Sequence, residues 1–186
     1  MRPMFTTALA VAIGTTLAWI GSTQGASCEP APSPSPTHNI PQSLVLEQQG
    51  ILDHLAVLAR RHGAVGVVAQ RYMALFERHA AREREYILPP LTLLPDLTTR
   101  EITPDDAWAM AMADRVRADH DVIFAEHTQI TEAANELLAA GRRAHAQTAI
   151  AFAEEAVGDS LNDMEIQEPA VLMIGAYLHS KLAAAP

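Results

Sequence analysis

The chain has 186 residues, of which 49% are hydrophobic and 19% charged, a composition typical of a globular protein rather than a disordered one. Only 5% of the residues are aromatic, and no series of short β-branched segments separated by turns occurs, which excludes an all-β sandwich or barrel. The formal net charge of −9 excludes a protein that binds nucleic-acid phosphates.

The N-terminus has the layout of an export signal over residues 1–27. Arg2 provides a short basic region, an apolar stretch runs from Ala8 to Ile20, and small residues precede Cys28. The apolar stretch is shorter than the roughly 20 residues that a membrane-spanning helix needs. We therefore expect an exported protein, located in the periplasm or attached to the bacterial cell envelope by a lipid anchor.

Cys28 is the only cysteine of the chain. The segment Gly25-Ala26-Ser27-Cys28 resembles a bacterial lipoprotein signal, in which the cysteine becomes the lipid-modified N-terminus, although Gly25 stands where a leucine-like residue is usual. Cleavage by an ordinary signal peptidase is the alternative. A lone cysteine can form neither an internal disulfide nor a thiolate metal cluster, so any bound metal must be held by histidine and carboxylate.

A Pro/Ser-rich linker is expected at residues 28–42, followed by a folded domain at 43–182. Apolar spacing and helix breakers predict four helices in that domain, at 43–62, 65–88, 104–140 and 142–182. Pro104 is a start signal for the third helix, and Pro169 should kink or split the fourth. Four helices with short connections predict an all-α, antiparallel (up-down-up-down) four-helix bundle.

Three of the predicted helices direct imidazole or carboxylate groups toward one interior. His79 and Glu83, one turn apart, lie on the apolar stripe of the second helix, and His120 and His127 lie on that of the third. His54 shares a face of the first helix with apolar neighbours. A single histidine on such a stripe is commonly a hydrogen-bonded core residue. Because several such side chains converge, we hypothesise that a bound metal offsets the free-energy cost of burying them.

The run from His79 through Glu83 to Pro89-Pro90, preceded by His54, resembles the first half of a hemerythrin-like domain of the HHE cation-binding family. The segment Glu165 to Leu178 is similar to the family's last helix. The resemblance covers residues 43–182 and implies a four-helix bundle that holds a non-haem di-iron site.

The resemblance also implies where the metal ligands lie. One ion would be held by the first two helices and a second by the last two, with Glu83 and Asp163 able to bridge them. Either His120 or His127 would serve as the ligand from the third helix. The implied ligands are His54, His79, Glu83, His120 or His127, Asp159 and Asp163.

The fourth predicted helix departs from the family pattern because it lacks the expected histidine. Aligning its proline with that of the second helix places Asp159 where the family has histidine and Asp163 where it has glutamate. Aspartate ligates iron, manganese or zinc, but it is a harder ligand than imidazole. The helical phase leaves an alternative in which Glu165 faces the core and Asp159 lies on the opposite side.

Three functions follow from these patterns. The first is a metal-binding hemerythrin-like protein whose open coordination positions bind oxygen or nitric oxide for sensing, scavenging or metal handling. The second is a metal-free helical bundle that acts as an interaction or scaffold module of the envelope. A di-metal oxidase or peroxidase is the third, but the Glu-x-x-His pairs of that class do not occur, and neither do common hydrolase or phosphate-loop motifs.

Overall fold

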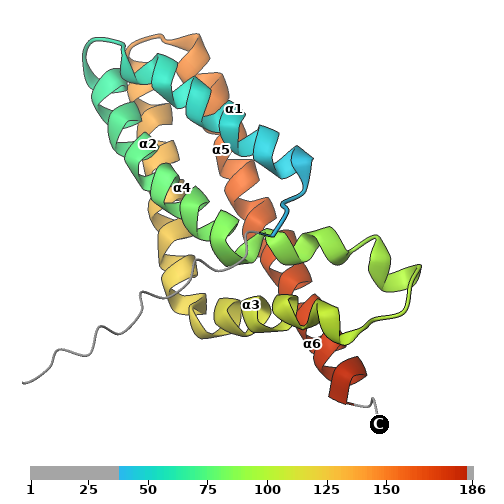
Figure 1. The fold of residues 1–186 in the computed structure, drawn as a ribbon. Helices are drawn as coiled ribbons and strands as arrows, with labels where there is room; N and C mark the ends of the chain where they lie inside the picture. Colours follow the sequence, from blue (N-terminus) through green and yellow to red (C-terminus); the bar gives the residue numbers. More distant parts are fainter. Residues whose placement is uncertain (1–37, 184–186) are drawn as a thin grey trace, which may run out of the picture. The chain divides into compact units, whose positions relative to one another are not determined.

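The computed structural model describes residues 38–183. The predicted export signal, Cys28 and most of the predicted linker lie outside the described residues. The described part is helical and contains no β-strand, which confirms the all-α class (Figure 1). No helix within it has both the length and the apolar character needed to cross a membrane. The α-helices are α1 (Gln42–Ala59), α2 (Ala64–Arg82), α3 (Ala107–Ala118), α4 (His120–Arg143), α5 (Gln147–Asn162) and α6 (Glu168–Ala183).

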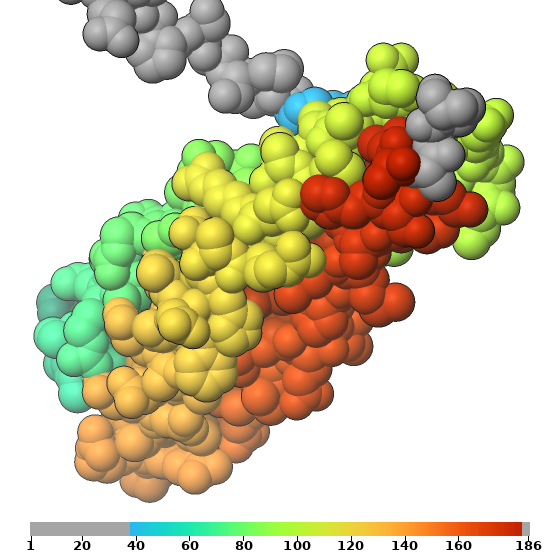
Figure 2. Space-filling model, turned by 90° about the horizontal axis from the view of Figure 1, so that it is seen from below, coloured from blue at the N-terminus to red at the C-terminus, as the bar shows by residue number. Residues whose placement is uncertain are grey.

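Helices α1, α2, α4 and α5 lie side by side, whereas α3 and α6 pack against each other at one end of this group (Figure 1). Helix α2 packs against both α1 and α4, and α4 packs against α5. Figure 2 shows the yellow surface of α3 and α4 against the orange and red surface of α5 and α6. The turn between α1 and α2 contains Gly63, whose φ of 82° is a conformation that glycine adopts without strain.

The structure corrects the predicted number of helices. The third predicted helix does begin at Pro104, in the 3₁₀ turn η4 (Pro104–Asp106), but it is interrupted at Asp119. Asp119 accepts a hydrogen bond from the Tyr86 hydroxyl at 2.9 Å. The interruption allows α3 to pack against α6 while α4 packs between α2 and α5. The fourth predicted helix consists of α5 and α6, which a π-helical turn before Pro169 joins without a break, and a division at this proline was predicted.

Two π-helical turns occupy equivalent places, η1 (Glu83–Ile87) after α2 and η5 (Asp163–Gln167) after α5. Each ends two residues before a proline, Pro89 or Pro169. Proline has no N–H and its ring clashes with the carbonyl one turn earlier, so the α-helical ladder cannot continue unchanged into it. In each turn, the N–H of the residue before the proline instead bonds to the carbonyl of the first residue of the turn. The predicted distortion before Pro169 is therefore this wider turn.

The interior contains two hydrophobic clusters separated by a polar layer. The first lies among α1, α2, α4 and α5, and the second joins η1, the following 3₁₀ turn η2 (Pro89–Leu93), α3, the start of α4 and α6. Along α4, Ile123 belongs to the second cluster and Ile130 to the first, with buried His127 between them. The order of residues along the helices therefore places polar groups where the two clusters meet.

The contact between α3 and α6 depends on Gly175. A Cβ added to Gly175 would collide with the Cβ of Ala113, so we expect Gly175→Ala to lower the free energy of unfolding by about 1–3 kcal/mol. At Gly50, in α1, an added Cβ would have nothing within 4 Å, so Gly50→Ala should instead raise it by about 0.5–1 kcal/mol. Urea unfolding followed by circular dichroism measures both changes. Equal effects of the two substitutions would contradict the close approach at Gly175.

Candidate metal centre

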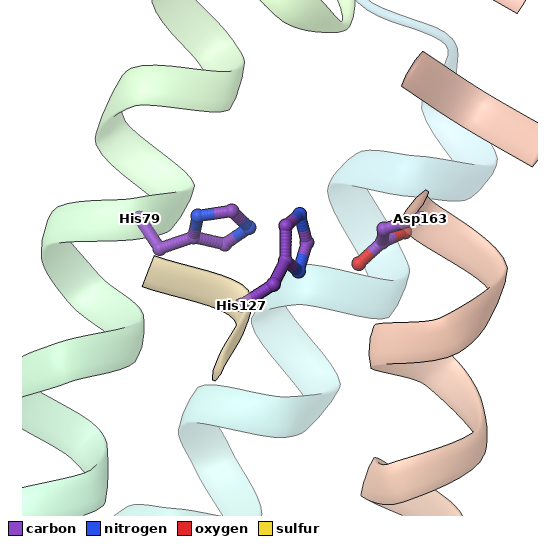
Figure 3. Close-up of side chains that lie close together, drawn as sticks. All are labelled: His79, His127 and Asp163. Carbon is purple, nitrogen blue, oxygen red and sulfur yellow. The ribbon is translucent and has the colours of Figure 1, made fainter. Parts of the chain in front are cut away.

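Two histidines and an aspartate from three different elements meet in the polar layer (Figure 3). They are His79 of α2, His127 of α4 and Asp163 of η5, and one potential ligand atom of each lies within 4.8 Å of the others. The two imidazole rings meet edge to face with their centroids 4.4 Å apart, and each histidine is only 1% exposed. Nitrogen and carboxylate oxygen ligands lie about 2.0–2.2 Å from the metal ion that they share. Small adjustments of the three side chains would therefore bring these ligand atoms around a single ion.

Two glutamates extend this cluster. Oε1 of Glu83 lies 3.3 Å from Nε2 of His79, and Oε1 of Glu168 lies 2.8 Å from Nε2 of His127. Neither contact has the alignment of a hydrogen bond, and both Nε2 atoms and Oε1 of Glu168 lack a hydrogen-bond partner among the described residues. A buried polar atom without a partner costs about 1–3 kcal/mol. Potential ligand atoms are thus buried at this point without being satisfied by the protein.

Two amide side chains hold the carboxylates in place. Nε2 of Gln48, on α1, donates to Oε2 of Glu83 at 2.6 Å, and the Gln167 amide donates to Oδ1 of Asp163. Gln48 is itself fixed by Arg84, whose Nε donates to its carbonyl oxygen at 2.6 Å. These bonds occupy one oxygen of each carboxylate and leave the other oxygen for a further partner.

A cavity of about 30 Å³ adjoins the cluster, enough for roughly one water-sized molecule. Its lining contains both apolar and acidic side chains. The apolar residues include Ile51, Tyr72, Phe76 and Ile130, and the acidic residues are Glu47, Glu83, Asp159 and Asp163.

The proximity of these acids changes the protonation of the cluster. Burial, together with the charge of Glu83, raises the pKa of Asp163 to about 8. Burial lowers the pKa of His79, but the Glu83 carboxylate beside its Nε2 and the hydrogen bond that its Nδ1 donates to Glu126 more than compensate and raise it to about 9. Burial and the charges of Asp159 and Glu83 raise the pKa of Glu47 as well. The cluster therefore favours added positive charge, whether protons or a metal cation.

Most of the residues predicted from the sequence line this cavity, namely His79, Glu83, His127, Asp159 and Asp163. Between the two candidates of the third predicted helix, His127 is the buried one. Between the alternatives for the fourth, Asp163 faces the interior, whereas Glu165 is exposed. Asp159 lies at the edge of the cavity and is partly exposed.

Two predicted ligands do not join the cluster. His120 is the first residue of α4, and its side chain is 58% exposed because the interruption at Asp119 ends the continuous stripe that would have buried it. His54 is exposed, with its ring stacked against Phe152 and its Nδ1 2.9 Å from the Gly50 carbonyl oxygen. The buried stripe of α1 passes through the neighbouring Leu55 instead. The expectation that His120 lies on the buried stripe is wrong, and His54 lies at the edge of the core rather than inside it.

Four residues around the cluster were not predicted as site residues, namely Gln48, Glu126, Gln167 and Glu168. Glu168 lies beyond the π-helical turn, so ordinary α-helical counting does not place it on the inner face. Its position directly before Pro169 and the apolar run at 169–176 is the signal that would have identified it. Gln48 and Glu126 meet their partners only through contacts between helices, which periodicity within one helix cannot reveal.

Comparison with protein-family models, with curated proteins and with solved structures found no match to this chain. What the centre can do is therefore inferred from its donor atoms and their surroundings.

The raised pKa values predict how pH affects the metal-free protein. The pKa of Asp163 rises from 3.8 to about 8, and that of His79 from 6.5 to about 9, so the folded state retains protons that the unfolded chain has released. The free energy of unfolding should therefore fall as pH rises from about 4 to 9, through Asp163 from about pH 4 to 8 and through His79 from about pH 6.5 to 9. In Asp163→Asn the fall should be smaller, because the contribution of the Asp163 carboxyl is removed.

Urea unfolding in the presence of a chelator, repeated across this pH range, measures the effect. Identical pH profiles for the wild type and Asp163→Asn would show that the Asp163 carboxyl does not hold a proton in the folded state.

Proposed function

We propose that this cluster binds a metal ion through His79, His127 and Asp163, with Glu83 and Glu168 as further carboxylate donors. The observation that carries the proposal is the burial of two imidazole Nε2 atoms without hydrogen-bond partners, in one cavity with carboxylates. Two imidazoles with one or more carboxylates form a donor set that suits non-haem iron, manganese or zinc. Without a cation, the buried carboxylates of this cavity would also repel one another.

We propose further that α1, α2, α4 and α5 form an antiparallel four-helix bundle of the hemerythrin-like kind and that the metal is non-haem iron. The matching π-helical turns support this, because they place Glu83 and Asp163 at equivalent positions in the two halves. Those two carboxylates are the candidates to lie between two ions in a di-iron form. Asp159, on the same cavity wall, would then supply a ligand to the second ion.

The proposed role is the binding of a small diatomic ligand, oxygen or nitric oxide, for sensing, scavenging or metal handling. A cavity of about 30 Å³ suits a ligand of this size. Tyr72, Phe76 and Ile130 in its lining suit an uncharged ligand. The bound metal would supply an open coordination position, and these side chains would limit what reaches it.

A metal-free scaffold remains the second candidate, and one observation favours it. Each buried histidine has a glutamate carboxylate within 3.3 Å, Glu83 for His79 and Glu168 for His127. If both histidines are protonated, charge pairing alone compensates part of their burial. The stability of the protein with and without metal distinguishes the two candidates.

We expect His79→Ala to abolish metal binding, because it removes a buried donor that no neighbour replaces. His54→Ala and His120→Ala are matched controls, since both side chains are exposed and should leave metal content unchanged. Metal at about 100 times its Kd should raise the free energy of unfolding by about 2.7 kcal/mol in the wild type and not in His79→Ala.

Elemental analysis and visible absorption of protein purified without chelator, before and after anaerobic loading with iron(II), provide the measurement. Equal metal content in the wild type and His79→Ala would contradict the ligand set. A wild type that takes up no metal even after loading would support the scaffold.

We also propose that the protein is exported and anchored through Cys28, on the basis of the signal-like sequence before it. Growth with labelled palmitate should label the wild type, and Cys28→Ser should lose the label, because its hydroxyl cannot replace the thiol in lipid attachment. Fractionation of the same cells shows the location. Label retained in Cys28→Ser would exclude this residue as the anchor point.

A further inference from the structure

Behind His79, on the side away from the cavity, lies a charged network that links α2 and α4. Oε2 of Glu126, on α4, is 3.3 Å from Nδ1 of His79. Arg82, on α2, holds both oxygens of the same carboxylate, with Nε to Oε2 and Nη2 to Oε1 each at 3.0 Å. The network thus approaches the ring nitrogen of His79 that does not face Glu83.

We propose that Glu126, held by Arg82, is a positioning residue that makes His79 a metal ligand. A neutral imidazole carries a proton on one nitrogen and a lone pair on the other. A carboxylate next to Nδ1 accepts the proton of that nitrogen, so the lone pair lies on Nε2 and points toward Asp163 and His127. The inference rests on the proposed metal centre, because this orientation has a role only if a metal ion binds Nε2.

The carboxylate of Glu126 is itself immobilised. The two-pronged contact with the planar guanidinium fixes both its position and its orientation. Nη1 of Arg82 also donates to the Tyr86 hydroxyl at 3.2 Å, and that hydroxyl donates to Asp119 at 2.9 Å. Tyr86 is only 1% exposed. The chain of contacts therefore ties the orientation of His79 to the junction between α3 and α4.

The two histidines of the centre differ in this respect. Nδ1 of His127 faces the Ser160 hydroxyl at 3.4 Å, a longer contact with an uncharged group. A carboxylate acceptor raises the basicity of its histidine more than a hydroxyl does. His79 should accordingly be the stronger and better-ordered ligand, and loss of Glu126 should weaken metal binding more than loss of the Ser160 hydroxyl.

The test compares Glu126→Gln with Ser160→Ala and with Glu132→Gln, which changes an exposed glutamate on the same helix. Competition with a chromophoric chelator gives the Kd for cobalt(II), used as the metal probe. Glu126→Gln should raise this Kd about 10–100-fold, Ser160→Ala less, and Glu132→Gln not at all. Arg82→Lys keeps the positive charge but loses the two-pronged contact, so it should raise the Kd by a smaller factor than Glu126→Gln. It replaces Glu126→Gln in the test if that variant folds poorly.

Nitrogen NMR of the metal-free protein, at a pH well above the His79 pKa of about 9 so that the ring is neutral, reports its tautomer directly. The wild type should carry the proton on Nδ1, and Glu126→Gln should shift it toward Nε2. An unchanged tautomer together with an unchanged Kd would overturn the positioning role. Failure of the wild type to bind cobalt(II) would overturn the metal centre instead, while the tautomer of His79 would still show whether Glu126 orients the ring.

Discussion

Two imidazole rings buried between two hydrophobic clusters impose a constraint that the surrounding structure has to meet. His79 and His127 have almost no contact with solvent, so each needs partners from the protein or from a bound ion. Carboxylates from α4, η1, η5 and α6 converge on them. Amide groups hold the carboxylates of η1 and η5, and Arg82 holds that of α4. The polar layer is therefore an ordered network rather than an accidental gap between the clusters.

The two π-helical turns connect this chemistry to the fold. Glu83 opens one turn and Asp163 opens the other, so each carboxylate enters the interior where its helix widens. Single π-helical turns within α-helices are frequently found at functional sites. Here a physical cause is visible in the chain, because a proline follows each turn at the same distance. The same prolines then direct the chain away from the group formed by α1, α2, α4 and α5 and into the second hydrophobic cluster.

The sequence predicted the helical class and the inner faces of the regular helices. His79 and Glu83 could be placed because they lie one turn apart on a helix whose apolar stripe continues on both sides. His120 was misplaced because nothing in the periodicity of residues 104–140 shows the break at Asp119. Glu168 was overlooked because a wider turn shifts the helical phase before it. The contacts of Gln48 and Glu126 depend on how separate helices pack, which the periodicity of a single sequence does not predict.

The π-helical turn at η5 also makes the length of that segment important. The i→i+5 bond of this turn takes up one residue more than an α-helical turn does, so one deleted residue would leave a regular α-helix. An inserted residue has no such place, and because each residue of an α-helix advances the chain by about 100° around the axis, it would rotate the whole of α6 relative to α5. Gly175 would then turn away from Ala113, and a larger side chain would face α3. Substitutions at the outward positions Glu165 and Ile166 change no such contact. An insertion in this segment should therefore be far less tolerated than a change in the identity of its exposed residues.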